Sequence, residues 1–164
     1  MHSSRVELLQ RMPIFGALRA DTLELLLAEA PLVERRSGEF FFREHEPAES
    51  MFVLESGRVE VFKSWQGREV RLRAFGAGDC FGEMALLDLQ PRSASVRALA
   101  DCCAIELRTA ALLHLFERDA EQFALMQMNL GRELSRRLRE AGEMLFRASV
   151  GVPGATDDPG PPTI

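Results

Sequence analysis

Two short runs carry the clearest chemical signal in the sequence: Phe81-Gly82-Glu83-Met84-Ala85-Leu86-Leu87 and Pro91-Arg92-Ser93-Ala94-Ser95-Val96. Gly82 opens a predicted helical turn, so the N–H groups of Glu83, Met84 and Ala85 lack intrahelical acceptors and can bind an anion. Arg92 can grip a phosphate through two parallel N–H···O bonds, and Ser93 adds a hydroxyl donor. Glu83 would repel that phosphate, so its useful partner is a sugar hydroxyl. This combination indicates a site for a compact nucleotide with a single phosphate charge.

The same residues also allow a purely structural interpretation. Glu83 and Arg92 could form a buried ion pair that closes a corner of a barrel, and the sequence alone leaves this alternative open. A polyphosphate ligand is disfavoured under either interpretation, because it would need more cations or a Mg²⁺ site.

Length, composition and charge restrict the class of protein. The 164 residues are enough for one domain with a real core, since 46% of them are hydrophobic. The net charge of -5 argues against a dominant nucleic-acid surface, which would need a basic excess. Every apolar run is shorter than the ~18 residues of a membrane span, and the N-terminus lacks the apolar core of a signal peptide. We therefore expect a cytoplasmic protein without a membrane segment.

Residues that hold metals or perform catalysis are sparse. Cys80, Cys102 and Cys103 are odd in number and lack metal-ligand spacing, which predicts reduced, structural thiols. The histidines stand singly, and no activated nucleophile or acid–base pair is visible. We expect no metal site, no cofactor and no enzymatic activity.

The hydrophobic pattern divides the chain into four segments. They are an N-terminal helical segment (1–31), a β-barrel core (32–109), C-terminal helices (110–147) and a disordered tail rich in Gly and Pro (148–164). Within the first segment we predict a short helix over 7–12. A second helix is predicted to begin at the N-cap Asp21, with Glu24 at the capping-box position.

The predicted core shows the period-two pattern of β-strands. Met51 to Leu54 is a continuous apolar run, as in a fully buried strand, and Trp65-Gln66-Gly67 is a predicted hairpin tip. Trp65 there could be exposed as a partner contact or fold back over the barrel. Eight or so short strands punctuated by glycine predict a mainly β protein, a β jelly-roll barrel flanked by N-terminal helices and a long C-terminal helix.

The long helix is predicted over 120–147, after a short helix over 110–116. Its apolar residues recur at spacings of three and four, which is the pattern of a seam that a second copy can cover. A helix of about 40 Å overhangs a small barrel, so we predict a homodimer, the alternative being packing on the chain's own barrel. The predicted seam consists of Phe123, Met126, Leu130, Leu134, Leu138, Ala141 and Leu145.

The run from Phe81 to Val96 resembles the phosphate-binding cassette of cyclic nucleotide-binding domains. These domains occur in bacterial catabolite-activator-type regulators, cyclic-AMP-dependent kinase regulatory subunits and nucleotide-gated channels. The resemblance covers roughly residues 8–147 and includes Gly78-Asp79 ahead of the cassette and Ser56-Gly57 after an early strand. It implies a β jelly roll flanked by helices.

The resemblance also implies roles for individual residues. Glu83 receives the ribose 2′-hydroxyl and Arg92 the cyclic phosphate. The backbone of Gly82 and Ala85 and the Ser93 hydroxyl complete the phosphate shell. Three further positions are implied to border the ligand: Val61 and Leu72, which wall the ribose and base, and Arg137, which lies near the phosphate and Glu83.

Some residues depart from the family pattern. Activator-type members carry a Thr-Ser pair that touches adenine, where this chain has Ala141 and Gly142. Ser93, in place of the Thr common in cyclic-GMP-preferring relatives, favours cyclic AMP (cAMP) over cyclic GMP (cGMP). The helix-turn-helix of the activators is absent from the sequence, so we expect no direct DNA binding and an unidentified protein partner downstream.

Two hypotheses follow for the function. The first is a stand-alone cyclic nucleotide receptor that signals to a partner through a conformational change. The second is a degenerate module of the same fold that binds no nucleotide and serves dimerisation or interaction, which Ala141 and Gly142 would favour.

Overall fold

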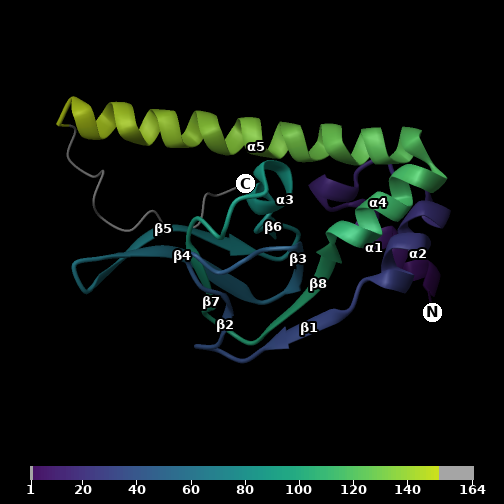
Figure 1. Cartoon of the computed structure of the whole chain (residues 1–164), viewed down its shortest axis with the longest axis horizontal. Helices are drawn as coiled ribbons and strands as arrows, with labels where there is room; N and C mark the ends of the chain where they lie inside the picture. The colour runs from purple at the N-terminus through teal and green to yellow at the C-terminus, as the bar shows by residue number, and fades with distance from the viewer. Residues whose placement is uncertain (1, 152–164) are drawn as a thin grey trace.

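The computed structural model describes residues 2–151, and Figure 1 shows strands covered by one long helix, with shorter helices at one end. The helices are α1 (His2–Gln10), the 3₁₀ turn η1 (Pro13–Phe15), α2 (Ala20–Glu29), α3 (Met84–Asp88), α4 (Thr109–Arg118) and α5 (Ala120–Ser149). The strands are β1 (Leu32–Arg35), β2 (Phe40–Phe42), β3 (Ser50–Ser56), β4 (Arg58–Trp65), β5 (Arg68–Gly76), β6 (Cys80–Phe81), β7 (Ser95–Ala98) and β8 (Cys102–Arg108).

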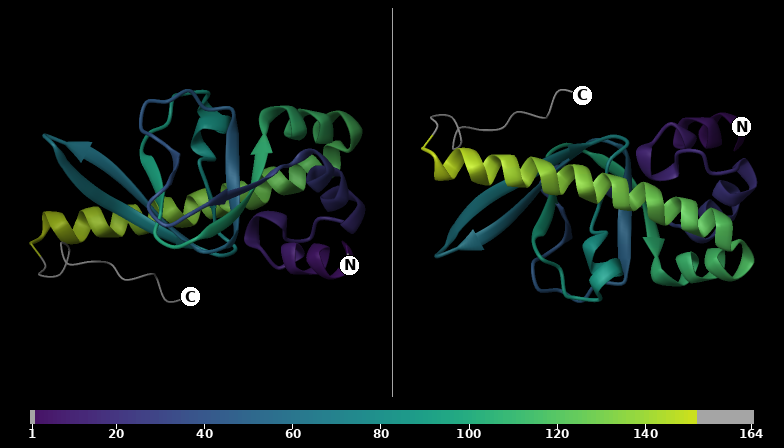
Figure 2. Two further views of the ribbon diagram at one scale, coloured as in Figure 1. Left: turned by 90° about the horizontal axis from the view of Figure 1, so that it is seen from below. Right: turned by 90° about the horizontal axis from the view of Figure 1, so that it is seen from above.

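The strands form two antiparallel sheets that confirm the predicted β jelly-roll class. One sheet has the order β1-β8-β3-β6 and the other the order β2-β7-β4-β5. The β4–β5 hairpin extends toward the C-terminal half of α5, as the two views of Figure 2 show. Across residues 2–151, no helix combines the length and the apolar character that crossing a bilayer requires.

The apolar run from Met51 to Leu54 is continuous because strand β3 is buried on both faces. Successive side chains of a strand point to opposite sides. Met51 and Val53 therefore join a core cluster with α1, α2 and α5, while Phe52 and Leu54 join a second cluster inside the sheets. The second cluster is rich in phenylalanine, and the Phe52 and Phe81 rings stack at 5.4 Å between centroids. This aromatic packing supports the strand that precedes the cassette.

The N-terminal helices differ from the sequence prediction at their ends. The predicted helix over 7–12 is α1, which ends at Gln10, and Asp21 is not the N-cap of α2 because Arg19 holds that position. The Arg19 N–H donates to Gln122 Oε1 at 2.8 Å. A side chain from α5 thus binds the chain at the start of α2, and no local capping pattern could reveal that.

Helix α5 divides the predicted dimer seam in two. Met126 and Leu130 are buried in the core cluster with α1 and α2, and Phe123 and Leu134 pack against it. Leu138 and Leu145 are 74% and 69% exposed. The first four seam residues therefore pack on the chain's own core, and a dimer interface could use only the C-terminal part of the seam.

Two further predictions concern the hairpin tip and the tail. Trp65 ends β4 beside a Gln66-Gly67 turn and is 65% exposed, so it does not fold back over the barrel. The predicted tail begins at 148, but α5 continues through Ser149. The rest of that prediction, from 152 to 164, lies outside the described residues.

Candidate ligand-binding site

Gly82 sets the geometry of the cassette between β6 and α3. Its φ of +78° is in the region that favours glycine. A Cβ atom at this position would lie 2.6 Å from Arg92 Nη1 and 3.1 Å from the Phe42 ring. Only glycine therefore allows the Arg92 guanidinium to lie directly against the backbone at the start of α3.

Arg92 is a buried cation that contacts no carboxylate among residues 2–151. The residue is only 5% exposed, and its guanidinium donates to the carbonyl oxygens of Gly82 at 3.0 Å and Ser50 at 2.8 Å. It also lies 3.9 Å from the centroid of the Phe42 ring, and its Nε has no hydrogen-bond partner within the described residues. Burial lowers the pKa of Arg92, although the side chain stays charged. An unmatched buried charge of this kind is costly unless an anion completes it.

Glu83 pairs with Arg137 and not with Arg92. Its carboxylate accepts from Arg137 Nη1 at 2.8 Å, and Glu83 is 4% exposed. The structural interpretation of a Glu83–Arg92 ion pair is therefore wrong. The Glu83 carboxylate and the Arg92 guanidinium are therefore not paired with each other. A site that binds a hydroxyl through one and a phosphate through the other requires this separation.

Arg137 joins the cassette to α5. It bonds Glu133 at 3.0 Å and the Cys80 carbonyl oxygen at 2.6 Å, and its guanidinium lies 4.4 Å from the centroid of the Phe75 ring. Burial alone would lower the pKa of Arg137, but Cys80 and the carboxylates of Glu83 and Glu133 raise it. The long helix is thus attached to the cassette through a buried charge network.

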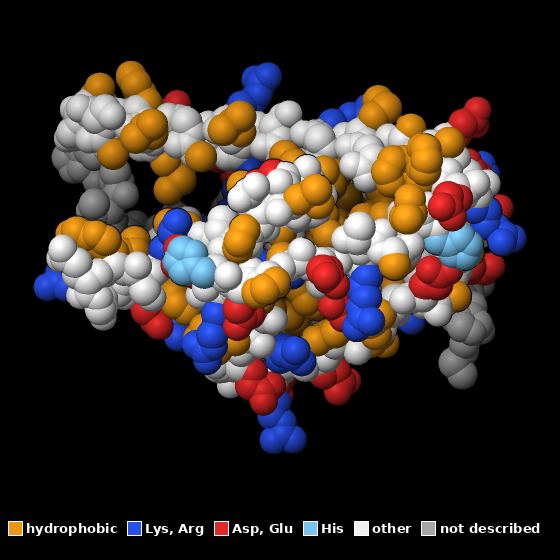
Figure 3. Space-filling model, in the orientation of Figure 1, with side chains coloured by type: hydrophobic (Ala, Val, Ile, Leu, Met, Phe, Trp, Pro, Cys, Tyr) orange, Lys and Arg blue, Asp and Glu red, His pale blue; other side chains and the backbone are white. Residues whose placement is uncertain are grey.

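A cavity of about 890 Å³ lies between the cassette, the β4–β5 hairpin and α5. The space-filling view shows an opening between the C-terminal half of α5 and the hairpin below it (Figure 3). All the residues that the sequence proposed for the ligand line this cavity: Val61, Leu72, Gly82, Glu83, Met84, Ala85, Arg92, Ser93 and Arg137. Its volume suits a nucleotide-sized ligand.

Several lining residues were missed by the sequence analysis. They are mostly on β5 and the C-terminal half of α5, and include Arg73, Phe75, Arg139, Glu140, Glu143, Met144 and Arg147. Glu140 and Met144 follow Arg137 by three and seven residues, which places them on the same face of the helix. That spacing was the signal available in the sequence. Ala141 also lines the cavity.

The polar side chains of the cassette suit the binding of an anion and a hydroxyl. Within residues 2–151, no group of three or more His, Cys, Asp or Glu side chains is placed to hold a metal ion. The polar groups at the cassette are a guanidinium, a carboxylate and the Ser93 hydroxyl, which suit an anion and a sugar hydroxyl.

Cys80, beside the site, provides a test of this buried environment. Burial raises the pKa of Cys80 to about 12, so at pH 8 only about one thiol in ten thousand is a thiolate. Burial raises the pKa of Cys102 and Cys103 as well. We expect Ellman's reagent at pH 8 to modify Cys80 slowly in the folded protein and all three thiols rapidly in urea. Peptide mapping that found Cys80 labelled at the rate of a free thiol would contradict this structure.

The model of the family described as "Cyclic nucleotide-binding domain" matches residues 32–119, more than half of the chain. This chain belongs to the cyclic nucleotide-binding domain family. The match begins at the first residue of β1 and ends just after α4, so it contains the cassette and both sheets.

Relatives of this cyclic nucleotide-binding domain include regulators from bacteria and eukaryotes. The chain is 33% identical to the cyclic AMP receptor protein of Thermus thermophilus over 79% of its own length and 58% of the relative. It is 34% identical to a cAMP-dependent protein kinase regulatory subunit of Emericella nidulans over 55% of its own length and 21% of the relative. The chain thus spans less than two thirds of the length of these relatives.

Solved structures show the same architecture. The Thermus thermophilus catabolite activator protein superposes with a TM-score of 0.72 at 33% identity, covering 84% of this chain and 63% of the other. The regulatory domain of Toxoplasma gondii PKA, solved with cAMP, gives a TM-score of 0.62 at 25% identity, covering 69% and 43%. The chain is therefore a cyclic nucleotide-binding domain of the type found in these regulatory proteins.

Proposed function

We propose that this domain is a receptor for a cyclic mononucleotide, with cAMP preferred to cGMP, and that it signals to a partner through α5. The observation that carries the proposal is the buried Arg92, which contacts no carboxylate in the described part of the chain yet borders the same cavity as Glu83. The cyclic phosphate would bind the Arg92 guanidinium, the Ser93 hydroxyl and the first N–H groups of α3. The ribose hydroxyl would donate to Glu83.

Arg137 gives this receptor a route to α5. Its Nη1 donates to the Glu83 carboxylate at 2.8 Å. A ribose hydroxyl that binds Glu83 changes the hydrogen bonding of Arg137, and hence the attachment of α5. A ligand with different affinity for two positions of the helix shifts their populations. The partner that would detect this shift is unidentified, and both a cytoplasmic location and the lack of direct DNA binding stay predictions from the sequence.

Titration calorimetry with cAMP, cGMP and linear AMP tests the proposed receptor. We expect both cyclic nucleotides to bind, cAMP more tightly, and AMP to bind more weakly because its dianionic phosphate lacks the cyclic shape. Bound ligand should also raise the melting temperature, as any ligand selective for the folded state does. If wild-type protein binds neither cyclic nucleotide at millimolar concentration, the domain is instead a degenerate interaction module.

A homodimer through the C-terminal part of α5 is also proposed. Leu138, Ala141 and Leu145 follow one another at spacings of three and four, and Leu138 and Leu145 are largely exposed. These residues form the stripe that a coiled coil covers.

We expect Leu138→Asp to convert the dimer to a monomer, because a carboxylate in a coiled-coil seam loses its hydration without a partner. Sedimentation velocity measures this change. Met128→Asp is the matched control. Met128 is 55% exposed on the same helix, but it points in a direction about a quarter turn around the helix axis from Leu138. A wild-type protein that sediments as a monomer at all concentrations would overturn the proposed dimer.

A further inference from the structure

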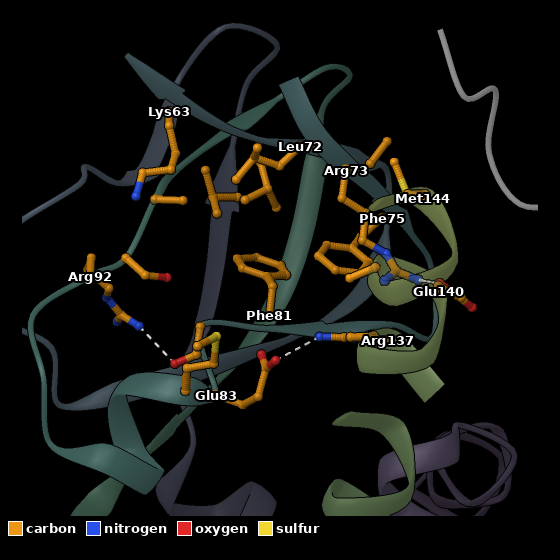
Figure 4. A pocket seen from close by; sticks show the side chains of 18 of the residues that line it. Lys63, Leu72, Arg73, Phe75, Phe81, Glu83, Arg92, Arg137, Glu140 and Met144 are labelled. Carbon is orange, nitrogen blue, oxygen red and sulfur yellow. Dashed lines mark hydrogen bonds and ion pairs between the residues drawn. The ribbon is translucent and has the colours of Figure 1, made fainter. Parts of the chain in front are cut away.

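A lysine borders the cavity at the same end as Arg92. Lys63, on β4, lines the cavity together with Arg92 and Ala94, and it is the only lysine in the sequence. Strand β4 pairs with β7 so that Phe62 lies opposite Ser95. Lys63 is the next residue of β4 and Ala94 precedes Ser95, so Lys63 lies beside the end of the cassette. Figure 4 shows its ammonium on the same side of the cavity as Arg92.

Lys63 is held there by a carboxylate that is itself bonded to the cassette. Its Nζ lies 3.3 Å from Oε1 of Glu44, on the loop between β2 and β3. The Glu44 N–H donates to Ser95 Oγ at 2.9 Å, and the His45 N–H donates to the carbonyl oxygen of Arg92 at 2.8 Å. The loop that carries Glu44 is therefore fixed at both ends of the segment from Arg92 to Ser95. The Lys63 ammonium is kept close to that segment.

The Lys63–Glu44 pair is weak enough for a ligand to replace it. The Lys63 side chain is 49% exposed, and ion pairs this exposed contribute little to stability. Among the contacts of the described residues, the ammonium uses one of its three donors. Its four-carbon stem is flexible, unlike the planar guanidinium of Arg92, which two carbonyl oxygens hold in place. Lys63 can therefore turn from Glu44 toward an anion in the cavity.

We propose that Lys63 is a second phosphate-binding cation, which leaves Glu44 for the ligand and sets how strongly the domain discriminates a cyclic phosphate from a terminal one. This inference rests on the proposed function, which places the phosphate on Arg92. A cyclic phosphodiester carries one negative charge, whereas a terminal phosphate carries close to two at pH 8, above its second pKa of about 6. Attraction to a cation grows in proportion to the charge of the ligand. Lys63 therefore favours the linear nucleotide more than the cyclic one and narrows the difference between them.

Lys63→Met removes this charge and keeps an unbranched side chain. We expect the affinity for cAMP to fall by roughly 3- to 10-fold, as for a charged hydrogen bond in a partly exposed site. The affinity for linear AMP should fall by roughly 10- to 100-fold, because the lost attraction is about twice as large. Calorimetric titration of both nucleotides at pH 8 measures the two losses. Arg68→Met is the matched control, since Arg68 is an exposed cation on the same hairpin outside the cavity and should change neither affinity.

Glu44→Gln should act in the opposite direction. It frees the Lys63 ammonium without removing it, so both affinities should rise, that for AMP more than that for cAMP. Because Glu44 acts through Lys63, the same substitution should have little effect in the Lys63→Met background. A pair that only held the loop in place would weaken both ligands in either variant, and that result would overturn the inference.

A single lysine also allows its contact with the ligand to be observed directly. Reductive methylation with ¹³C-formaldehyde keeps the charge of the amine, and the spectrum of Lys63→Met distinguishes the Lys63 signal from that of the terminal amine. We expect saturating cAMP to shift the Lys63 signal. An unmoved signal, or equal losses for cAMP and AMP in Lys63→Met, overturns the inference while the receptor function stands. If wild type binds neither cAMP nor cGMP, the proposed function is overturned and this inference with it.

Discussion

Replacing Arg92 by methionine should remove cyclic nucleotide binding while the domain stays folded. The methionine side chain retains apolar contact with Phe42, 3.9 Å from the present guanidinium, but has no charge for the phosphate. Loss of a buried charged contact costs about 2–5 kcal/mol in binding. The affinity for cAMP should therefore fall by roughly 30-fold to several thousand-fold.

The stability of the Arg92 variant should change much less than its affinity. Two carbonyl oxygens, those of Gly82 and Ser50, lose their donors, each worth ~1 kcal/mol. The variant also no longer buries a cation whose Nε is unpaired, which offsets part of this loss. Thermal denaturation and titration calorimetry on the same sample separate the two effects. A variant that bound cAMP within threefold of wild type would refute the role of Arg92.

The cassette could be predicted because its chemistry is local in sequence. Gly82, Glu83 and Arg92 lie within eleven consecutive residues, and few other functions would place these three residue types in that order. What the sequence could not show was the partner of each charge. Glu83 pairs with Arg137, 54 residues away, and Arg92 pairs with no carboxylate among the described residues. Long-range pairing follows from how α5 crosses the sheets, and single-sequence patterns carry little of that information.

Helix α5 shows a second limit of sequence patterns. Spacings of three and four describe both a core-facing helix and a coiled-coil seam. Met126 and Leu130 face the core and are buried there. Leu138 and Leu145 are exposed and could belong to a coiled-coil seam. The change occurs where α5 passes beyond the helices α1 and α2. Only the position of those helices determines where the core ends.

Replacing Arg137 by alanine should have the largest effect on stability. The Arg137 and Glu83 side chains are only 11% and 6% exposed, so removing the cation leaves the Glu83 and Glu133 carboxylates without it in a poorly solvated site. Breaking a buried pair in this way costs about 3–5 kcal/mol. Urea denaturation should show that loss in the free energy of unfolding, and binding should weaken because Glu83 is no longer held in place.

A double-mutant cycle distinguishes the charge network from simple loss of packing around Arg137. Glu83→Gln combined with Arg137→Ala removes both charges of the pair, so the double variant should be more stable than the sum of the two single effects predicts. Arg147→Ala is the matched control, since its pair with Glu143 is about 60% exposed on the same helix and should cost at most ~1 kcal/mol. Additive effects in the cycle would show that Glu83 and Arg137 do not stabilise each other, and α5 would then be held on the cassette by apolar packing alone.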